Sequence, residues 1–136
     1  MIVIDTNVVS EMMRYDPDRT VLAWSDRVGR LHATSITLAE IEYGIARLPD
    51  GHRKDQLAET AHSVFADFDE VILAFDSPAA QRYAGIVIGR ERAGRPIATA
   101  DAQIAAICAS RDATLATRNT GDFDGTGVSL LNPWKG

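Results

Sequence analysis

Short runs of apolar, mostly β-branched residues alternate with longer stretches of helical periodicity along this chain. The runs are typical of buried strands, and we expect strands over residues 2–4, 31–36, 71–75, 114–117 and 128–131. Between them, helices are expected over residues 8–13, 20–28, 38–48, 55–68, 78–92 and 99–109. Strands separated by helices predict an α/β fold with three α/β/α layers and a short, mostly parallel central sheet.

The composition limits the classes of protein to be considered. The 136 residues carry 14 Lys and Arg against 19 Asp and Glu, a formal net charge of −5. This charge argues against binding nucleic acid by bulk attraction, but a local site with a bound cation remains compatible with it. The apolar fraction of 46% is that of a globular chain, and the length fits a single domain over residues 1–136. One cysteine, Cys108, excludes a disulfide framework and a cysteine-based zinc site.

Neither a secretory signal nor a membrane span is expected. Asp5 interrupts the first apolar run after four residues, and no basic region precedes that run. No window approaches the roughly 20 apolar residues that a membrane-spanning helix needs. We therefore expect a cytoplasmic protein without a membrane partner.

Polar residues follow the first predicted strand directly, as Asp5-Thr6-Asn7. In open parallel sheets, ligands bind beyond the carboxyl ends of the strands. A carboxylate at that position is costly to desolvate unless it has a partner, such as a cation or a basic group. An equal alternative is that Asp5 only caps the helix that follows it.

Two further acids lie near the starts of predicted helices. Glu40 fits a capping box with Thr37 as the N-cap, which is a structural role. Glu42 lies about 200° around the same helix, so the two carboxylates cannot serve one point, and the apolar stripe does not choose between them. Asp101 lies on the buried face of its helix, one turn from Ile104, with Thr99 expected as the N-cap. An acid that faces inward indicates a functional role.

Asn119 and Asp122 follow the predicted strand over residues 114–117, and an Asx turn explains either one singly. Taken together, however, all these acids fall at one edge of the predicted sheet, where like charges repel. A hard divalent cation, Mg²⁺ or Mn²⁺, would resolve that repulsion because both favour oxygen ligands. The three histidines are scattered and show no metal-ligand spacing.

Four segments of this chain carry a resemblance to a known family. They are Ile2-Val3-Ile4-Asp5-Thr6-Asn7, Ser35-Ile36-Thr37-Leu38-Ala39-Glu40 with Gly44 four residues on, Ile97-Ala98-Thr99-Ala100-Asp101, and Ala116-Thr117-Arg118-Asn119-Thr120-Gly121-Asp122-Phe123. In this order and spacing they resemble PIN-domain ribonucleases, and the closing Asn132-Pro133-Trp134 is similar to the VapC/FitB subgroup of toxin–antitoxin systems. The resemblance implies a PIN-like fold and an Mg²⁺-dependent endoribonuclease toxin that leaves 5′-phosphate and 3′-hydroxyl ends. It also implies a homodimer and a cognate antitoxin as partner.

The resemblance also assigns residues. It implies that Asp5 and Asp101 bind Mg²⁺ and that Glu40, rather than Glu42, is the second catalytic acid. The fourth position stays open, because Asn119 stands where some members have Asp, whereas Asp122 supplies an acid three residues later. We expect a catalytic set made up of Asp5, Glu40, Asp101 and Asp122, with Asn119, Thr6 and Asn7 as additional site residues.

A basic cluster formed by Arg90, Arg92 and Arg95 precedes Pro96. These side chains are candidates for contacts with the RNA backbone. The alternative is a solvated helix end, which carries no function.

Three other functions compete with the ribonuclease. One is a metal-dependent nuclease on DNA or structured substrates. Another is a degenerate PIN domain that binds RNA or partners without cleavage, an interpretation that the amide at Asn119 keeps open. The third is a phosphatase with Asp5 as nucleophile, against which Asn7 stands, because the haloacid-dehalogenase pattern has an acid there.

Overall fold

The sheet at the centre of the molecule has three parallel strands in the order β1 (Ile2–Ile4), β2 (Thr114–Ala116) and β3 (Ser129–Leu131). The structure is a computed structural model that describes residues 1–68 and 72–136. In register, Val3 pairs with Leu115, which pairs with Leu130. The helices that surround the sheet are α1 (Thr6–Met12), α2 (Arg19–Val28), α3 (Ser35–Ala46), α4 (His52–Ala66), α5 (Ser77–Arg92) and α6 (Thr99–Ser110). Two short 3₁₀ turns, η1 (Thr120–Phe123) and η2 (Pro133–Lys135), follow β2 and β3.

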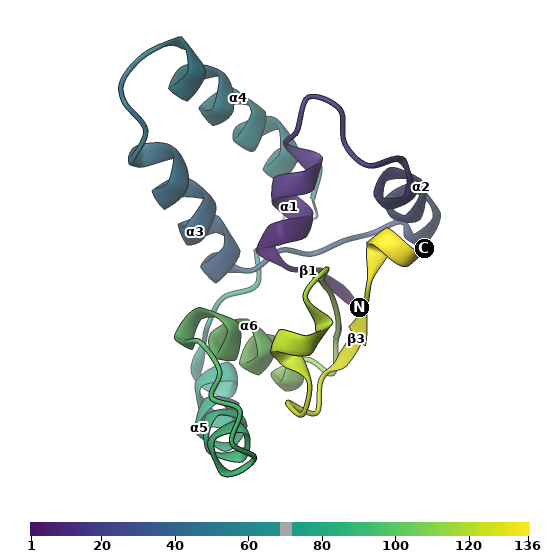
Figure 1. The fold of residues 1–136 in the computed structure, drawn as a ribbon, viewed down its shortest axis with the longest axis vertical. Coiled ribbons are helices and arrows are strands. Elements are labelled where there is room, and N and C mark those ends of the chain that lie inside the picture. Colours follow the sequence, from purple (N-terminus) through teal and green to yellow (C-terminus); the bar gives the residue numbers. More distant parts are fainter. Residues whose placement is uncertain (69–71) are drawn as a thin grey trace.

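Two apolar clusters fill the space on the two sides of the sheet. Successive residues of a strand point to opposite faces, so Val3 and Leu115 join one cluster, whereas Ile4 and Ala116 join the other. The first cluster is completed by α5 and α6, and the second by residues of α1, α2, α3 and α4. Figure 1 shows α3 and α4 as an antiparallel pair beside α1, with α5 and α6 at the other end of the view. The predicted three-layer α/β/α fold with a parallel sheet is confirmed.

Two predicted strands are wrong in their extent. Over residues 31–36 the pairing is reduced to single parallel bridges, His32 with Val3 and Thr34 with Leu73. The cause is local, since the hydroxyl of Thr34 accepts a hydrogen bond from the Thr37 amide at 3.1 Å and starts α3 at Ser35. Thr37 is therefore inside the helix, and its predicted role as N-cap is wrong.

The predicted strand over residues 71–75 lies partly outside the described residues, because Val71 is not among them. Of its described part, only Leu73 forms a bridge. The N-cap of α6 also differs from the prediction. Ala98 holds that position, without a side-chain cap, and Thr99 is the first residue of the helix. Among the described residues, no helix is long and apolar enough to cross a membrane.

Candidate active site

Asp5 directly follows β1 and is the most enclosed of the four predicted catalytic acids, with 5% of its surface exposed. One carboxylate oxygen accepts a hydrogen bond from the Thr6 amide at 2.8 Å, so Asp5 does cap α1. The other oxygen accepts from the Thr117 hydroxyl at 2.8 Å and from the Asn7 amide group at 3.4 Å. Burial raises the pKa of Asp5, and the negative charges of Glu40 and Asp122 raise it further, against the lowering effect of the hydrogen bonds. Asp5 therefore caps α1 and also lines the cleft, so the two roles considered for it do not exclude each other.

Asp101 lies in the first turn of α6 and lines the same cleft as Asp5. Its pKa is raised from 3.8 to about 6, chiefly because the side chain is partly buried. The charges of Asp5, Asp122 and Glu40 raise this pKa further, and Arg90 lowers it. The acids predicted from separate segments therefore interact electrostatically in one place.

Glu40 reaches the cleft from α3 and is positioned by a threonine of α1. The Thr6 hydroxyl donates to the Glu40 carboxylate at 2.8 Å and lies 3.0 Å from the Thr37 hydroxyl. Thr6 therefore ties α1 to α3 across the cleft. Glu42 is exposed and is not among the residues that line the cleft, so the choice of Glu40 over Glu42 agrees with the placement of the two side chains.

Asn119 and Asp122 both line the cleft at the η1 turn, and both are exposed. The main-chain N–H of Asn119 donates to the Thr117 hydroxyl at 3.1 Å. This bond links the η1 turn to Asp5, because the same hydroxyl donates to the Asp5 carboxylate. Because both side chains reach the cleft, their placement leaves open which of them fills the fourth position.

Arg90 is buried, and the prediction that it contacts RNA is wrong for that reason. Only 5% of its surface is exposed. Its guanidinium donates to the main-chain carbonyls of Arg95 at 2.6 Å, Asp122 at 2.6 Å and Asp124 at 3.1 Å. Arg95 is exposed and binds the Asp124 carboxylate at 2.9 Å and the Gly121 carbonyl at 3.0 Å. The two arginines hold the η1 turn and thereby place Asp122, whereas Arg92 is exposed and outside the cleft.

The cleft that these residues form has a volume of about 600 Å³. It contains the four predicted catalytic acids and the three predicted additional residues, namely Asp5, Glu40, Asp101 and Asp122 with Thr6, Asn7 and Asn119, but none of the three arginines predicted to contact RNA. Five more residues line it that the sequence did not single out for the site, namely Ser10, Glu11, Arg14, Arg118 and Trp134. Trp134 had a signal in the closing Asn-Pro-Trp segment, but its sequence position alone does not connect it to the first strand.

The donor set of the cleft suits a hard cation. Within residues 1–68 and 72–136, no three Asp, Glu, His or Cys side chains already surround a common point as ligands of one metal ion. The oxygen donors nevertheless share one cleft, and their mutual repulsion contributes to the raised pKa values of Asp5 and Asp101. Mg²⁺ typically takes one or two carboxylates and keeps several waters, which fits Asp5 and Asp101 as direct ligands.

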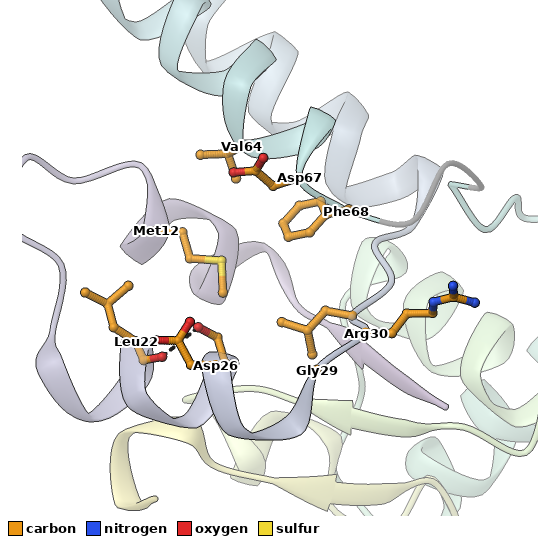
Figure 2. Close-up of a pocket in the computed structure, with 10 residues that line it drawn as sticks. Met12, Leu22, Asp26, Gly29, Arg30, Val64, Asp67 and Phe68 are labelled. Atoms are coloured by element: carbon orange, nitrogen blue, oxygen red, sulfur yellow. Dashed lines mark hydrogen bonds between the residues drawn. The ribbon is translucent and has the colours of Figure 1, made fainter.

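A second cavity lies away from the carboxylates, between α2 and the end of α4 (Figure 2). Its apolar lining includes Met12, Val64 and Phe68, and Asp26 and Asp67 add negative charge. None of the predicted site residues lines it. This cavity therefore has no part in the chemistry of the acidic cleft.

The parallel sheet and the acid-lined cleft define the class of this protein. It is a small α/β protein whose site lies beyond the carboxyl ends of the strands, where parallel sheets bind ligands. Residues 2–127 match the PIN domain, and the chain belongs to the PIN domain family. Toxin FitB of Neisseria gonorrhoeae is 40% identical over 98% of this chain and 99% of its own length. VapC ribonuclease Y4jK of Sinorhizobium fredii is 36% identical over 99% of both chains.

A solved structure agrees with these sequence relatives. The crystal structure of FitAcB from Neisseria gonorrhoeae superposes with a TM-score of 0.89 at 40% identity, over 98% of this chain and 99% of that chain. The predicted resemblance to PIN-domain proteins of the VapC/FitB subgroup is therefore confirmed.

Proposed function

We propose that this protein is a metal-dependent endoribonuclease that hydrolyses RNA phosphodiester bonds and acts as the toxin of a toxin–antitoxin pair. One observation carries the proposal. Carboxylates from the end of β1, from α3, from α6 and from η1 line a single cleft and interact electrostatically there. The relative named VapC ribonuclease supports RNA as the substrate class.

Asp5 and Asp101 are the residues that would hold Mg²⁺ or Mn²⁺. When bound, such a cation supplies positive charge to the phosphate and lowers the pKa of a coordinated water. The protein prepares the two ligands differently. Asp5 is fixed by Thr117 and Asn7, whereas Asp101 is held by the first turn of α6.

Glu40 and Asp122 remain for proton transfer and for orienting the attacking water. Glu40 is exposed and is aligned by the Thr6 hydroxyl at 2.8 Å, so it can accept a proton from a water in the cleft. Asp122 is carried by the turn that Arg90 holds through its main chain. Both carboxylates adjoin the proposed ligands without being buried themselves.

Cleavage of a total RNA pool with and without Mg²⁺ tests the proposed function. The parent protein should fragment RNA only when the metal is present, and Asp5→Asn, which keeps the shape of the side chain, should abolish cleavage. A panel of single-stranded, duplex and flapped DNA is assayed in parallel. Preferential cleavage of DNA would replace the proposal with a DNA nuclease, and binding of RNA without cleavage would indicate a degenerate domain.

An antitoxin partner is the second part of the proposal. An apolar groove of about 770 Å³ runs between α1, α3 and α4 and shares Thr6, Ser10, Arg14 and Glu40 with the acidic cleft. Its apolar lining includes Met13, Ile41, Ile45, Leu48 and Leu57. A partner segment that fills this groove would reach the cleft, where an Arg or Lys can pair with the acids.

Co-expression with a small protein encoded next to this one tests the partner. The complex should purify intact and should not cleave RNA. Leu48→Glu in the groove should release the partner, whereas Leu22→Glu, in the cavity of Figure 2, should not. We also propose a homodimer, which sedimentation velocity of the purified chain checks directly.

A further inference from the structure

An arginine and a tryptophan are stacked at the edge of the acidic cleft. The guanidinium carbon of Arg118 lies over the indole ring of Trp134, 5.0 Å from its centroid. Both residues line the cleft together with Asp5 and Asp101. Arg118 directly follows Thr117, the residue whose hydroxyl binds Asp5. The stacked pair is therefore adjacent to the carboxylates.

Hydrogen bonds fix the backbone of both partners before any ligand arrives. The Arg118 amide donates to the Asn7 side chain at 3.3 Å, and the Arg118 carbonyl accepts from the Asn132 side chain at 3.5 Å. The same Asn132 side chain accepts from the Trp134 amide at 2.9 Å and so caps η2. Trp134 also packs against the apolar cluster formed by residues of α1, α2, α3 and α4. The indole is thus held in place beneath the arginine.

The guanidinium of Arg118 is exposed, and its donors are not in use. In the part of the chain that the structure describes, this group forms no hydrogen bond and no ion pair, only its contact with the indole. The other arginines close to the site behave differently. Arg14 pairs with Glu11 at 3.4 Å, and Arg90 and Arg95 hold the η1 turn. Arg118 alone among these four is stacked and otherwise unengaged.

Unpaired RNA bases stack on aromatic side chains and on guanidinium planes. Such stacking tolerates any sequence, because every base has a π face. We propose that Arg118 and Trp134 form a platform for one unpaired base beside the scissile phosphate. The proposal rests on the proposed ribonuclease function and specifies its substrate as RNA that is single-stranded at that nucleotide, since a paired base is already stacked within its own helix.

A series of RNA oligonucleotides with one cleaved bond tests the platform. Each member carries a single abasic nucleotide at a different position around that bond. The parent protein should lose about tenfold in kcat/KM at one position next to the bond and little elsewhere. Arg118→Ala should lower cleavage of the intact RNA about tenfold and should no longer distinguish the abasic RNA.

Two variants separate stacking from charge and from packing. Arg118→Lys keeps the charge but loses the planar group, so it should behave like Arg118→Ala. Trp134→Leu keeps apolar packing but loses the ring, so it should also lose the abasic sensitivity. Arg19→Ala removes the same charge from an exposed position outside the cleft and should match the parent protein.

Binding gives a readout that does not depend on cleavage. With the Asp101→Asn chain, fluorescence anisotropy should show that a labelled intact oligonucleotide binds about tenfold more tightly than its abasic counterpart, a difference that Arg118→Ala should abolish. Full activity of Arg118→Lys, or an abasic series without a sensitive position, would overturn the platform and leave the ribonuclease intact. Discrimination in binding without any cleavage by the parent protein would support the platform and refute the ribonuclease.

Discussion

Replacing Asp101 with Asn should stabilise the folded protein at neutral pH, although it removes a proposed metal ligand. Burial and the charges of Asp5, Asp122 and Glu40 raise the pKa of Asp101 from 3.8 to about 6. Because this pKa is higher in the folded state, the folded protein holds the proton more tightly than the unfolded chain. Ionised Asp101 therefore destabilises the fold, and Asn removes the charge that causes this.

The magnitude and the pH range follow from the same values. One pKa unit corresponds to about 1.4 kcal/mol, so a rise from 3.8 to about 6 corresponds to about 3 kcal/mol at most. Partial exposure of the side chain reduces this to about 1–2 kcal/mol, or roughly 4–8 °C in Tm for a chain of this size. The destabilisation is absent below about pH 4, develops between pH 4 and 6, and is complete above that range.

Thermal unfolding followed by circular dichroism, with EDTA present, measures this effect. Asp101→Asn should melt above the parent protein at pH 7.5 and together with it near pH 4. Asp55→Asn is the matched control, because Asp55 also lies in the first turn of a helix but is exposed. Asp55→Asn loses a favourable interaction with the helix dipole of α4 and should lower the free energy of unfolding by about 0.3–1 kcal/mol. An equal gain for Asp101→Asn at both pH values, or no gain at pH 7.5, would refute the reasoning.

Four further outcomes follow from the site. Millimolar Mg²⁺ should raise the Tm of the parent protein by binding its native state, and the absence of any shift would count against a metal site. Asp5→Asn should reduce RNA cleavage by orders of magnitude, and adding Asp101→Asn should change little more, because both disable one unit; additive losses would contradict a single site. Asp122→Asn should reduce RNA cleavage at least about tenfold, equivalent to about 1.4 kcal/mol, whereas Asn119→Asp should keep or raise it. Kinetic assays in which Asp122→Asn has no effect and Asn119→Ala is inactive would assign the fourth position to the Asn119 side chain. Arg90→Ala should lower the free energy of unfolding in urea by about 3 kcal/mol, because it removes a buried side chain and leaves three main-chain carbonyls without their charged donor. A loss below about 1 kcal/mol would mean that the η1 turn does not depend on Arg90.

Local pattern was sufficient for most elements and for the placement of the acids. Buried strands and amphipathic helices are set by residues one to four positions apart. The runs around Val3, Leu115 and Leu130 therefore indicated strands that the structure confirms. A parallel sheet brings the carboxyl ends of its strands to one edge, so the cleft position of Asp5 and Asp122 followed from the predicted topology.

Competition between neighbouring caps was not decided by local pattern. Thr34 and Thr37 are both plausible N-caps for the helix that carries Glu40. In the structure Thr34 is the N-cap of α3, and its backbone also forms a parallel bridge with Leu73. A pattern of near neighbours does not show this pairing with a residue 39 positions along the chain. The predicted strand over residues 31–36 was too long because the Thr34 cap starts α3 at Ser35.

Contacts between distant segments depended on tertiary structure alone. By sequence, Arg90 and Arg92 are equivalent members of one basic cluster, but packing of α5 beneath the η1 turn buries only Arg90 and joins it to Asp122, 32 residues away. The same holds for Thr6 and Glu40, which lie 34 residues apart and meet at 2.8 Å. The sequence by itself determined that polar residues directly follow the strands, because strands and their ends are set by residues close together in the chain. Which side chains are enclosed, which stay free for a substrate, and which hold a loop were decided by the packing of helices against the sheet, since burial is a property of the assembled layers.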